Sequence, residues 1–294
     1  MDRLNRLLAV CATLISFAGS PVAAEKLPLW ELEGTRGNVY LLGSVHFLRA
    51  SDYPLPAGME SALDAADSLV MEIDMDDLDP LATQQILGSI GANSNSQSLQ
   101  DVMGAEDYAK ANELAQKIGI DLAMFSPFKP WFVALTVTQL RMMQMGFDPN
   151  WGIETRFTAQ AAEQGKSIAG LETLEEQLGF LDQLDAETQK LFLLQSLEDA
   201  VEVEAEVQRI VSAWRGGDTA ALEELLVEGL QETPGLYEAI LTDRNRNWVP
   251  QIARLAEEPG THLVVVGTMH LVGKDSVLAL LEAQGISSRQ LSAE

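Results

Sequence analysis

Cysteine is almost absent from this chain of 294 residues. The one cysteine, Cys11, lies in an apolar N-terminal segment that we expect to be removed. The mature chain would then have no disulfide bond, no thiolate metal ligand and no cysteine nucleophile. A chain without cysteine also suits an oxidising compartment, because it has no thiol that can mispair.

Positive charge is scarce as well. The chain has 19 Lys and Arg residues against 44 Asp and Glu residues, which gives a net charge of −25 at pH 7. Phosphate backbones and anionic membrane surfaces repel a chain of this charge. We therefore expect no nucleic acid partner and no binding to an anionic membrane surface.

The apolar run of about 20 residues that a membrane-spanning helix needs is also missing. The N-terminus instead has Arg3 and Arg6, a short apolar stretch from Leu7 to Ala18, and small residues up to Ala24. This order is typical of a secretory signal peptide. We predict cleavage after Ala24, so that residues 1–24 are the signal and residues 25–294 form one α/β domain in the periplasm or outside the cell. A retained N-terminal anchor is the alternative.

Short apolar runs near both ends of the chain predict the strands of a central sheet. The middle is mostly helical, with a long acidic region at residues 174–258. We therefore predict an α/β fold with a mixed or mostly parallel sheet built from both chain ends and a large helical insertion. The predicted strands are residues 29–33, 38–43, 68–74, 166–171, 262–268 and 286–291, and the clearest predicted helices are residues 56–67, 107–117, 130–145, 152–164 and 275–284. The helix at 56–67 and the strands beside it predict a parallel strand–helix–strand unit.

One pattern, an apolar run followed by Gly-x-x-His, occurs twice. It ends in Gly43-Ser44-Val45-His46 near the start of the chain and in Gly267-Thr268-Met269-His270 near its end. A single buried histidine at a strand end is more often a core residue, but the repetition favours a shared site at the carboxyl edge of the sheet. The third histidine, His262, has no such motif, and we interpret it as structural or exposed.

Three more charged residues are candidates for the same site. Glu72 lies in an apolar strand, where an unpaired carboxylate costs several kcal/mol. Glu172 follows another predicted strand, and Arg244 shares a helix face with Trp248. Each has a structural alternative: an ion pair for Glu72, a helix cap for Glu172 and a surface salt bridge for Arg244.

Two imidazoles with one or two carboxylates can hold a divalent transition metal. Zn²⁺, Co²⁺ and Mn²⁺ accept this mixture of ligands. We therefore predict His46, His270 and Glu72 as metal ligands, with the identity of the metal left open. The motifs of serine hydrolase elbows, dinucleotide sites and P-loops are all absent from the sequence.

Short segments along nearly the whole mature chain resemble the TraB/GumN family, which also contains the animal Tiki proteases. The segments that carry the resemblance are Gly43-Ser44-Val45-His46, Tyr53-Pro54-Leu55-Pro56, Val70-Met71-Glu72-Ile73-Asp74, Lys129-Pro130-Trp131, Gly152-Ile153-Glu154, Gly165-Lys166, Gly170-Leu171-Glu172-Thr173-Leu174-Glu175-Glu176-Gln177, Trp214, Gly217-Asp218, Leu236-Tyr237-Glu238, Arg244-Asn245 and Gly267-Thr268-Met269-His270-Leu271-Val272-Gly273.

The resemblance implies an α/β core related to erythromycin esterase-like and haem-binding ChaN-like proteins. It also implies a metal-dependent peptidase chemistry centred on His46, His270 and Glu72. In the second motif, Thr268 and Met269 stand where many relatives have small residues. This difference leaves the three predicted metal ligands in place.

Three functional hypotheses follow from the sequence. The leading one is a metal-dependent hydrolase of peptides or other small substrates, with Glu72 as ligand or general base, Arg244 stabilising the oxyanion and Glu172 as a further catalytic residue. The second keeps the fold but uses His46 and Glu72 directly, as an esterase without metal would. The third is a protein that binds a peptide or haem without turning it over. The sequence does not name the oligomeric state.

Overall fold

The computed structural model describes residues 25–293, and its centre is a six-stranded mixed sheet with the order β4-β3-β5-β2-β1-β6. Parallel pairs join β2 to β5, β5 to β3 and β3 to β4, whereas β1 pairs antiparallel with both β2 and β6. The strands are β1 (Lys26–Leu32), β2 (Asn38–Ser44), β3 (Ser68–Met71), β4 (Ser167–Gly170), β5 (Thr261–Gly267) and β6 (Ser288–Ser292). The predicted α/β class, with a mixed sheet and a helical insertion, is therefore confirmed.

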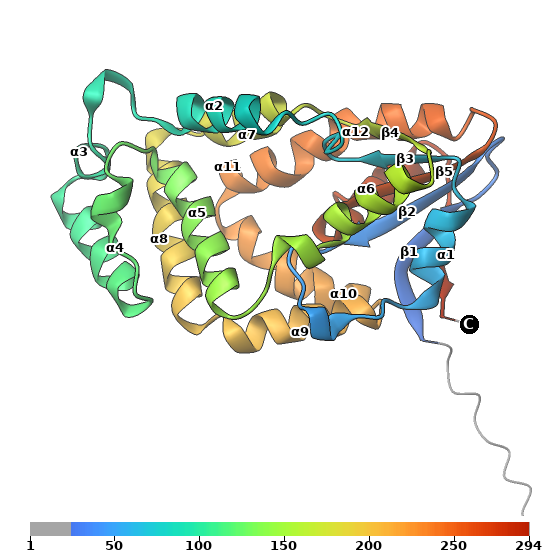
Figure 1. Cartoon of the computed structure of the whole chain (residues 1–294), viewed down its shortest axis with the longest axis horizontal. Coiled ribbons are helices and arrows are strands. Elements are labelled where there is room, and N and C mark those ends of the chain that lie inside the picture. The colour runs from blue at the N-terminus through green and yellow to red at the C-terminus, as the bar shows by residue number, and fades with distance from the viewer. Residues whose placement is uncertain (1–24, 294) are drawn as a thin grey trace, which may run out of the picture.

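The helices separate into those that cover the sheet and those that extend beyond it. Figure 1 shows the sheet in the right half of the molecule and α3, α4, α5 and α8 in the left half. The α-helices are α1 (Ala57–Ala65), α2 (Pro80–Gly91), α3 (Leu99–Met103), α4 (Ala105–Lys117), α5 (Pro130–Gln144), α6 (Ile153–Glu163), α7 (Leu174–Asp182), α8 (Ala186–Glu202), α9 (Glu204–Arg215), α10 (Thr219–Glu223), α11 (Pro234–Tyr237), α12 (Asp243–Leu255) and α13 (Val277–Ala283). Within residues 25–293, no helix has both the length and the apolar character that a membrane crossing requires.

Strand β5 is buried on both faces, which explains its continuous apolar sequence. Side chains alternate along a strand, so Leu263 and Val265 join the core on one face while Val264 and Val266 join the core on the other. Helices α1, α6 and α9 cover the first face, and α12 and α13 cover the second. The sheet therefore lies between two helical layers, and only its ends are open for a site.

The predicted strand–helix–strand unit is only partly correct. Strands β2 and β3 run in the same direction, but they do not pair, because β5 from the far end of the chain lies between them. The fully buried β5 has the most apolar surface to hide, and the centre of the sheet is the place that hides it. The predicted signal peptide, residues 1–24, lies outside the described residues.

Candidate functional site

Side chains named from the sequence follow the carboxyl ends of all four parallel strands. Because β2, β5, β3 and β4 run in the same direction, their carboxyl ends form one edge of the sheet. His46 follows β2, His270 follows β5, Glu72 follows β3 and Glu172 follows β4. The structure brings all four to this edge, where Arg244 of α12 joins them.

The two Gly-x-x-His motifs lie side by side. In the parallel pairing of β2 with β5, Gly43 is opposite Val266 and Ser44 is opposite Gly267. A Cβ atom at Gly43 would lie 2.8 Å from Oγ1 of Thr268, so glycine is needed for this close approach. The second motif then turns into the short 3₁₀ helix η8 (Thr268–Leu271), which carries His270 back over the sheet edge.

Glu72 is buried and fully engaged in hydrogen bonds. Its Oε1 accepts from the Gly267 backbone N–H at 2.6 Å, and its Oε2 accepts from Arg244 at 2.5 Å and from Gln177 at 3.1 Å. Burial raises the pKa of Glu72, but the Arg244 guanidinium, the two imidazoles and the Gly267 N–H together more than offset this and lower the pKa to about 2. Glu72 is therefore ionised at neutral pH.

The strand prediction around Glu72 needs one correction. Strand β3 ends at Met71, so Glu72 lies just beyond the strand rather than within it, and the half-buried Asp74 lies in the loop that follows. The pairing with the next strand nevertheless continues, because the Glu172 N–H donates to the Glu72 carbonyl at 2.9 Å. This backbone bond fixes the two glutamates next to each other.

Glu172 is a partner of Arg244 and not a helix cap. Its Oε1 accepts from Nε of Arg244 at 3.0 Å and from Nη2 at 2.7 Å, and its Oε2 accepts from Trp248 at 3.0 Å. The cap of α7 is Thr173, which forms a reciprocal pair of bonds with Glu176. Burial raises the pKa of Glu172, and Arg244 offsets only part of that rise.

Arg244 is the buried centre of the cluster. Nη2 bridges the carboxylates of Glu72 and Glu172, while Nη1 lies 3.3 Å from Nε2 of His270 and 3.4 Å from the Ile240 carbonyl. The guanidinium also stacks on Trp248, with 4.6 Å from Cζ to the ring centroid. Arg244 is thus a buried ion-pair partner, not the surface salt bridge of the structural alternative.

His270 is neutral in this arrangement. Its Nδ1 lies 2.6 Å from Oδ1 of Asn245, whose amide nitrogen donates to the Asp275 carbonyl. This network assigns the proton of His270 to Nδ1, which leaves the Nε2 lone pair to accept from Arg244. Burial lowers the pKa of His270 to about 3.

His46 has the opposite surroundings. Its Nδ1 lies 2.8 Å from Oε1 of Glu154, and the imidazole is 60% exposed. Glu154 lies in the first turn of α6 and also accepts a hydrogen bond from Ser44. The Glu154 charge, its hydrogen bond to the ring and the charge of Glu72 raise the pKa of His46 to about 9. His46 is therefore held toward its imidazolium form.

Sequence reasoning missed Glu154 as a site residue, together with Ser44, Gln177 and Asn245. Glu154 stands in Gly152-Ile153-Glu154, one of the segments that carry the family resemblance, and that was the available signal. Ser44 and Glu154 are 110 positions apart in the sequence, so no local pattern reveals their contact. The predicted partner of His46, Glu72, instead bonds to Arg244.

The donor atoms suit the predicted metal in type but not in arrangement. His46 Nε2 and Glu72 Oε1 lie 3.9 and 3.2 Å from the place where a Cβ of Gly267 would stand, so two donors converge there. Nε2 of His270 is 4.0 Å from Oε1 of Glu72, whereas a tetrahedral Zn²⁺ holds its donors about 3.4 Å apart. Arg244 also occupies the lone pair of His270. Among residues 25–293, no group of three or more His, Cys, Asp or Glu side chains is arranged to hold a metal ion.

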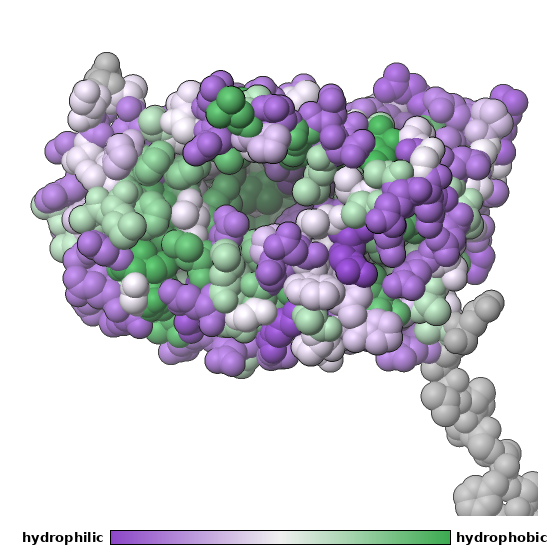
Figure 2. Space-filling view, viewed as in Figure 1, coloured by the Kyte–Doolittle hydropathy of each residue, from purple (hydrophilic) through white to green (hydrophobic). Residues whose placement is uncertain are grey.

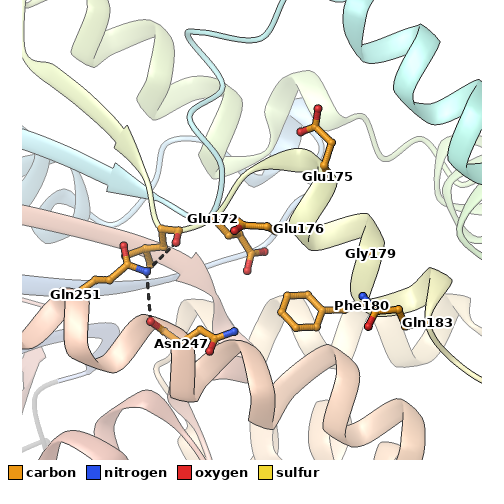
Figure 3. Close-up of a pocket in the computed structure, with 9 residues that line it drawn as sticks. Glu172, Glu175, Glu176, Gly179, Phe180, Gln183, Asn247 and Gln251 are labelled. Carbon is orange, nitrogen blue, oxygen red and sulfur yellow. Dashed lines mark hydrogen bonds between the residues drawn. The ribbon is translucent and has the colours of Figure 1, made fainter.

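Two small cavities open on either side of His46. One, of about 190 Å³, lies against α9, and the other, of about 250 Å³, lies beyond the end of β3. A larger cavity of about 590 Å³ has Glu172 in its wall, together with Glu175, Glu176 and Phe180, but contains neither site histidine. Figure 3 shows this larger cavity between α7 and α12. We assign the site to the smaller cavities, because His46 lines both and Glu72 and Glu154 line the one beyond β3.

The fold and the site together define a class: an α/β protein whose polar cluster lies at the carboxyl ends of four parallel strands that are far apart in the sequence. The profile of the TraB/PrgY/gumN family matches residues 28–290, and the chain belongs to this family. This confirms the family resemblance seen in the sequence.

The relatives in this comparison carry no described activity. YbaP of Escherichia coli K12, itself called uncharacterized, is 25% identical over 252 residues, which are 85% of this chain and 89% of YbaP. An uncharacterized protein of Treponema pallidum strain Nichols is 21% identical over 286 residues, which are 92% of this chain and 85% of that protein. No solved structure matches the chain significantly.

Proposed function

We propose that this protein is a hydrolase in which His46 transfers protons during attack of water on a peptide or another small acyl substrate. The observation that carries the proposal is the pairing of His46 with Glu154 at 2.8 Å on a ring that is 60% exposed. A histidine oriented by a carboxylate and open to a cavity is the usual arrangement of a general base.

The reaction begins with unprotonated His46. Its Nδ1 is held by Glu154, so Nε2 takes the proton from water while the water oxygen adds to the carbonyl carbon. The C–N or C–O bond of the substrate then breaks, and the imidazolium gives the proton to the departing nitrogen or oxygen. Glu154 and Glu72 both stabilise the imidazolium, and general base catalysis of this kind contributes about 10²- to 10⁴-fold.

Buried residues fix the position of Glu72 beside His46. The guanidinium nitrogens of Arg244 are directed at Glu72, Glu172, His270 and the Ile240 carbonyl. Arg244 therefore acts as a positioning residue that keeps Glu72 ionised beside His46. The predicted contact of Arg244 with an oxyanion stays a prediction, because it requires Arg244 to exchange one of these partners.

Metal dependence is the second candidate. The convergence of His46 Nε2 and Glu72 Oε1 over Gly267 favours it, and the position of Arg244 opposes it. The predicted Mn²⁺, Co²⁺ or Zn²⁺ stays a prediction. We also propose that the mature protein works in the periplasm or outside the cell, on the strength of its N-terminal sequence.

A turnover assay tests both candidates. The purified protein is treated with a chelator, dialysed and assayed against peptide and ester libraries, alone and with added Zn²⁺, Mn²⁺ or Co²⁺. We expect activity without metal and a loss of about 10²-fold or more in His46→Ala. The matched control is His262→Ala, because His262 bonds to Ser68 at the other end of the strands. Thermal melts establish that each variant is folded.

Each of the remaining outcomes of the assay would support a different hypothesis. Activity that returns only with metal, with an acid limb that moves as metal rises, would establish the metal-dependent reaction. Hydrolysis that survives His46→Ala would overturn the role of His46. No hydrolysis under any condition would leave the peptide- or haem-binding protein as the remaining hypothesis.

A further inference from the structure

The walls of the two cavities beside His46 are mostly apolar; besides the catalytic groups, the polar residues in them are Ser44 and Thr268 in one cavity and Thr155 and Gln177 in the other. His46 and Phe47 stand in the walls of both cavities. We call them the α9 cavity and the β3 cavity. The apolar walls of the α9 cavity are Met142, Val207, Ile210, Val211, Leu226 and Met269, and those of the β3 cavity are Phe47, Met71, Ile73, Met75, Leu78 and Pro149.

The size of each cavity suits one side chain. An apolar cavity of about 150 Å³ is large enough to hold a benzene ring. The α9 cavity of about 190 Å³ and the β3 cavity of about 250 Å³ are each somewhat larger. Each therefore accommodates one large aliphatic or aromatic group, and His46 lies between the two groups.

The carboxylates in the wall of the β3 cavity select against acidic groups. In the α9 cavity, the Ser44 hydroxyl donates to Glu154 and the Thr268 hydroxyl donates to the Ser44 carbonyl, so both donors are occupied. In the β3 cavity, Glu72 and Glu154 both have lowered pKa values because of their cationic partners, and they remain negative. An anionic side chain would lose its hydration there and meet two like charges.

The groove continues beyond both cavities. On the β3 side, a cavity of about 480 Å³ shares Ile73 and Leu78 with the β3 cavity. On the α9 side, a cavity of about 490 Å³ shares Met142, Ile210 and Leu226 with the α9 cavity. It runs between α5 and α8 on one side and α9 on the other. Figure 2 shows that the visible face of the molecule is hollowed between its two halves, with hydrophobic residues in the hollow. A substrate that fills the α9 cavity therefore has room to extend into the next cavity. A chain-like substrate such as a peptide is long enough to do so.

We propose that the substrate is a peptide with a large apolar residue on each side of the bond that is cut, extending beyond the α9 cavity. This inference rests on the proposed hydrolase function. His46 between two apolar cavities places the scissile bond between two apolar side chains. Water supplies the oxygen to the new carboxylate and one proton, through His46, to the new amine.

A peptide library tests the proposal. The purified protein is incubated with a library of random-sequence peptides, and mass spectrometry identifies the new termini. Because removing apolar contact in a binding pocket costs about 10- to 200-fold in discrimination, we expect enrichment of at least tenfold for Leu, Met or Phe over Asp or Glu on both sides of the cut.

Three variants distinguish a change in one subsite from a general loss of structure or activity. Ile210→Ser changes the α9 cavity and Met75→Ser changes the β3 cavity, so each should weaken the apolar preference on one side of the cut and leave the other side unchanged. Leu81→Ser is the matched control, because Leu81 is 63% exposed and lines neither cavity. Equal loss on both sides in both cavity variants would overturn the assignment.

The outcomes distinguish this inference from the proposed function. Cleavage of peptides without apolar preference, or cleavage of esters alone, overturns the inference while the hydrolase function stands. If nothing is cut, the library is passed over immobilised His46→Ala protein. Retention of apolar peptides would then support the two subsites and overturn hydrolysis, and no retention would overturn both.

Discussion

His46 and His270 each end a Gly-x-x-His motif, yet their surroundings shift their pKa values in opposite directions. Glu154 raises the pKa of the exposed His46 ring, whereas burial lowers the pKa of His270 to about 3. The first is therefore suited to exchanging protons with a substrate, and the second to accepting a fixed hydrogen bond from Arg244. The duplication supplies two histidines at one edge of the sheet but does not give them one role.

Replacement of Glu154 by Gln is expected to shift the pH dependence of hydrolysis. Gln keeps a hydrogen-bond acceptor for Nδ1 of His46 but removes the charge that raises its pKa. The base form of His46 accumulates as pH rises through its pKa. The acid limb of kcat/KM should therefore lie above pH 6.5 in the parent protein and move to lower pH in Glu154→Gln. A limb at the same pH in both proteins would contradict this role.

Replacement of Arg244 by Met is expected to destabilise the fold severely. It leaves Glu72 and Glu172 buried without their cation, and removing one partner of a buried ion pair costs about 3–5 kcal/mol. Arg246→Met on the same helix is the control: its side chain is 63% exposed and pairs only with Asp243, so its cost should stay within about 0.5 kcal/mol. Denaturant unfolding measures the stabilities of both variants. Equal stability would refute the assignment of Arg244 as the buried ion-pair partner of Glu72 and Glu172.

Individual residues were predictable where the sequence places them directly after a strand. His46, His270, Glu72 and Glu172 could be named because parallel strands bring their carboxyl ends to one edge. Their partners could not be named. Whether Glu72 bonds to Arg244 or His46 depends on how α12 packs across the sheet edge, and helix packing over about 170 residues of separation leaves no local pattern.

At the scale of elements, close backbone contact between the two motifs controls the position of His270. We expect Gly43→Ala to destabilise the protein by about 1–3 kcal/mol, because its Cβ would lie 2.8 Å from Thr268 Oγ1 and 3.2 Å from Thr268 Cα. Gly88→Ala in α2 is the control: no atom lies within 4 Å of its Cβ, and it should add about 0.5–1 kcal/mol of stability. Thermal melts compare the stabilities of the two variants. If Gly43→Ala is as stable as the parent protein, then η8 can move to accommodate the added Cβ.

Most strands and the longer helices were predictable from the sequence because their patterns are local. The run from Leu263 to Val266 gives β5, and apolar spacing gives α5. The order of the strands was not predictable from adjacent segments. Strands β2 and β3 are joined by α1, yet β5 separates them, since total burial decides which strand is central.

At the scale of the whole molecule, the N-terminal sequence predicts processing. The basic start, the apolar run and Val22-Ala23-Ala24 predict that the secreted protein begins at Glu25. Intact-mass measurement of protein from the periplasm or medium checks this. A mass that includes residues 1–24 on soluble protein would refute it, and variants at Ala24 would then be expected to have no effect on release.

The position of β5 sets the order in which the chain can fold during synthesis. Strands β2 and β3 are made early, but the strand that joins them begins only at Thr261 of 294 residues. A nascent chain that ends before Thr261 therefore has two separate strand pairs, β1 with β2 and β3 with β4, in place of one sheet, and it lacks His270. Contacts this distant in sequence form slowly. The sheet and the site are therefore completed only when almost all of the chain has left the ribosome.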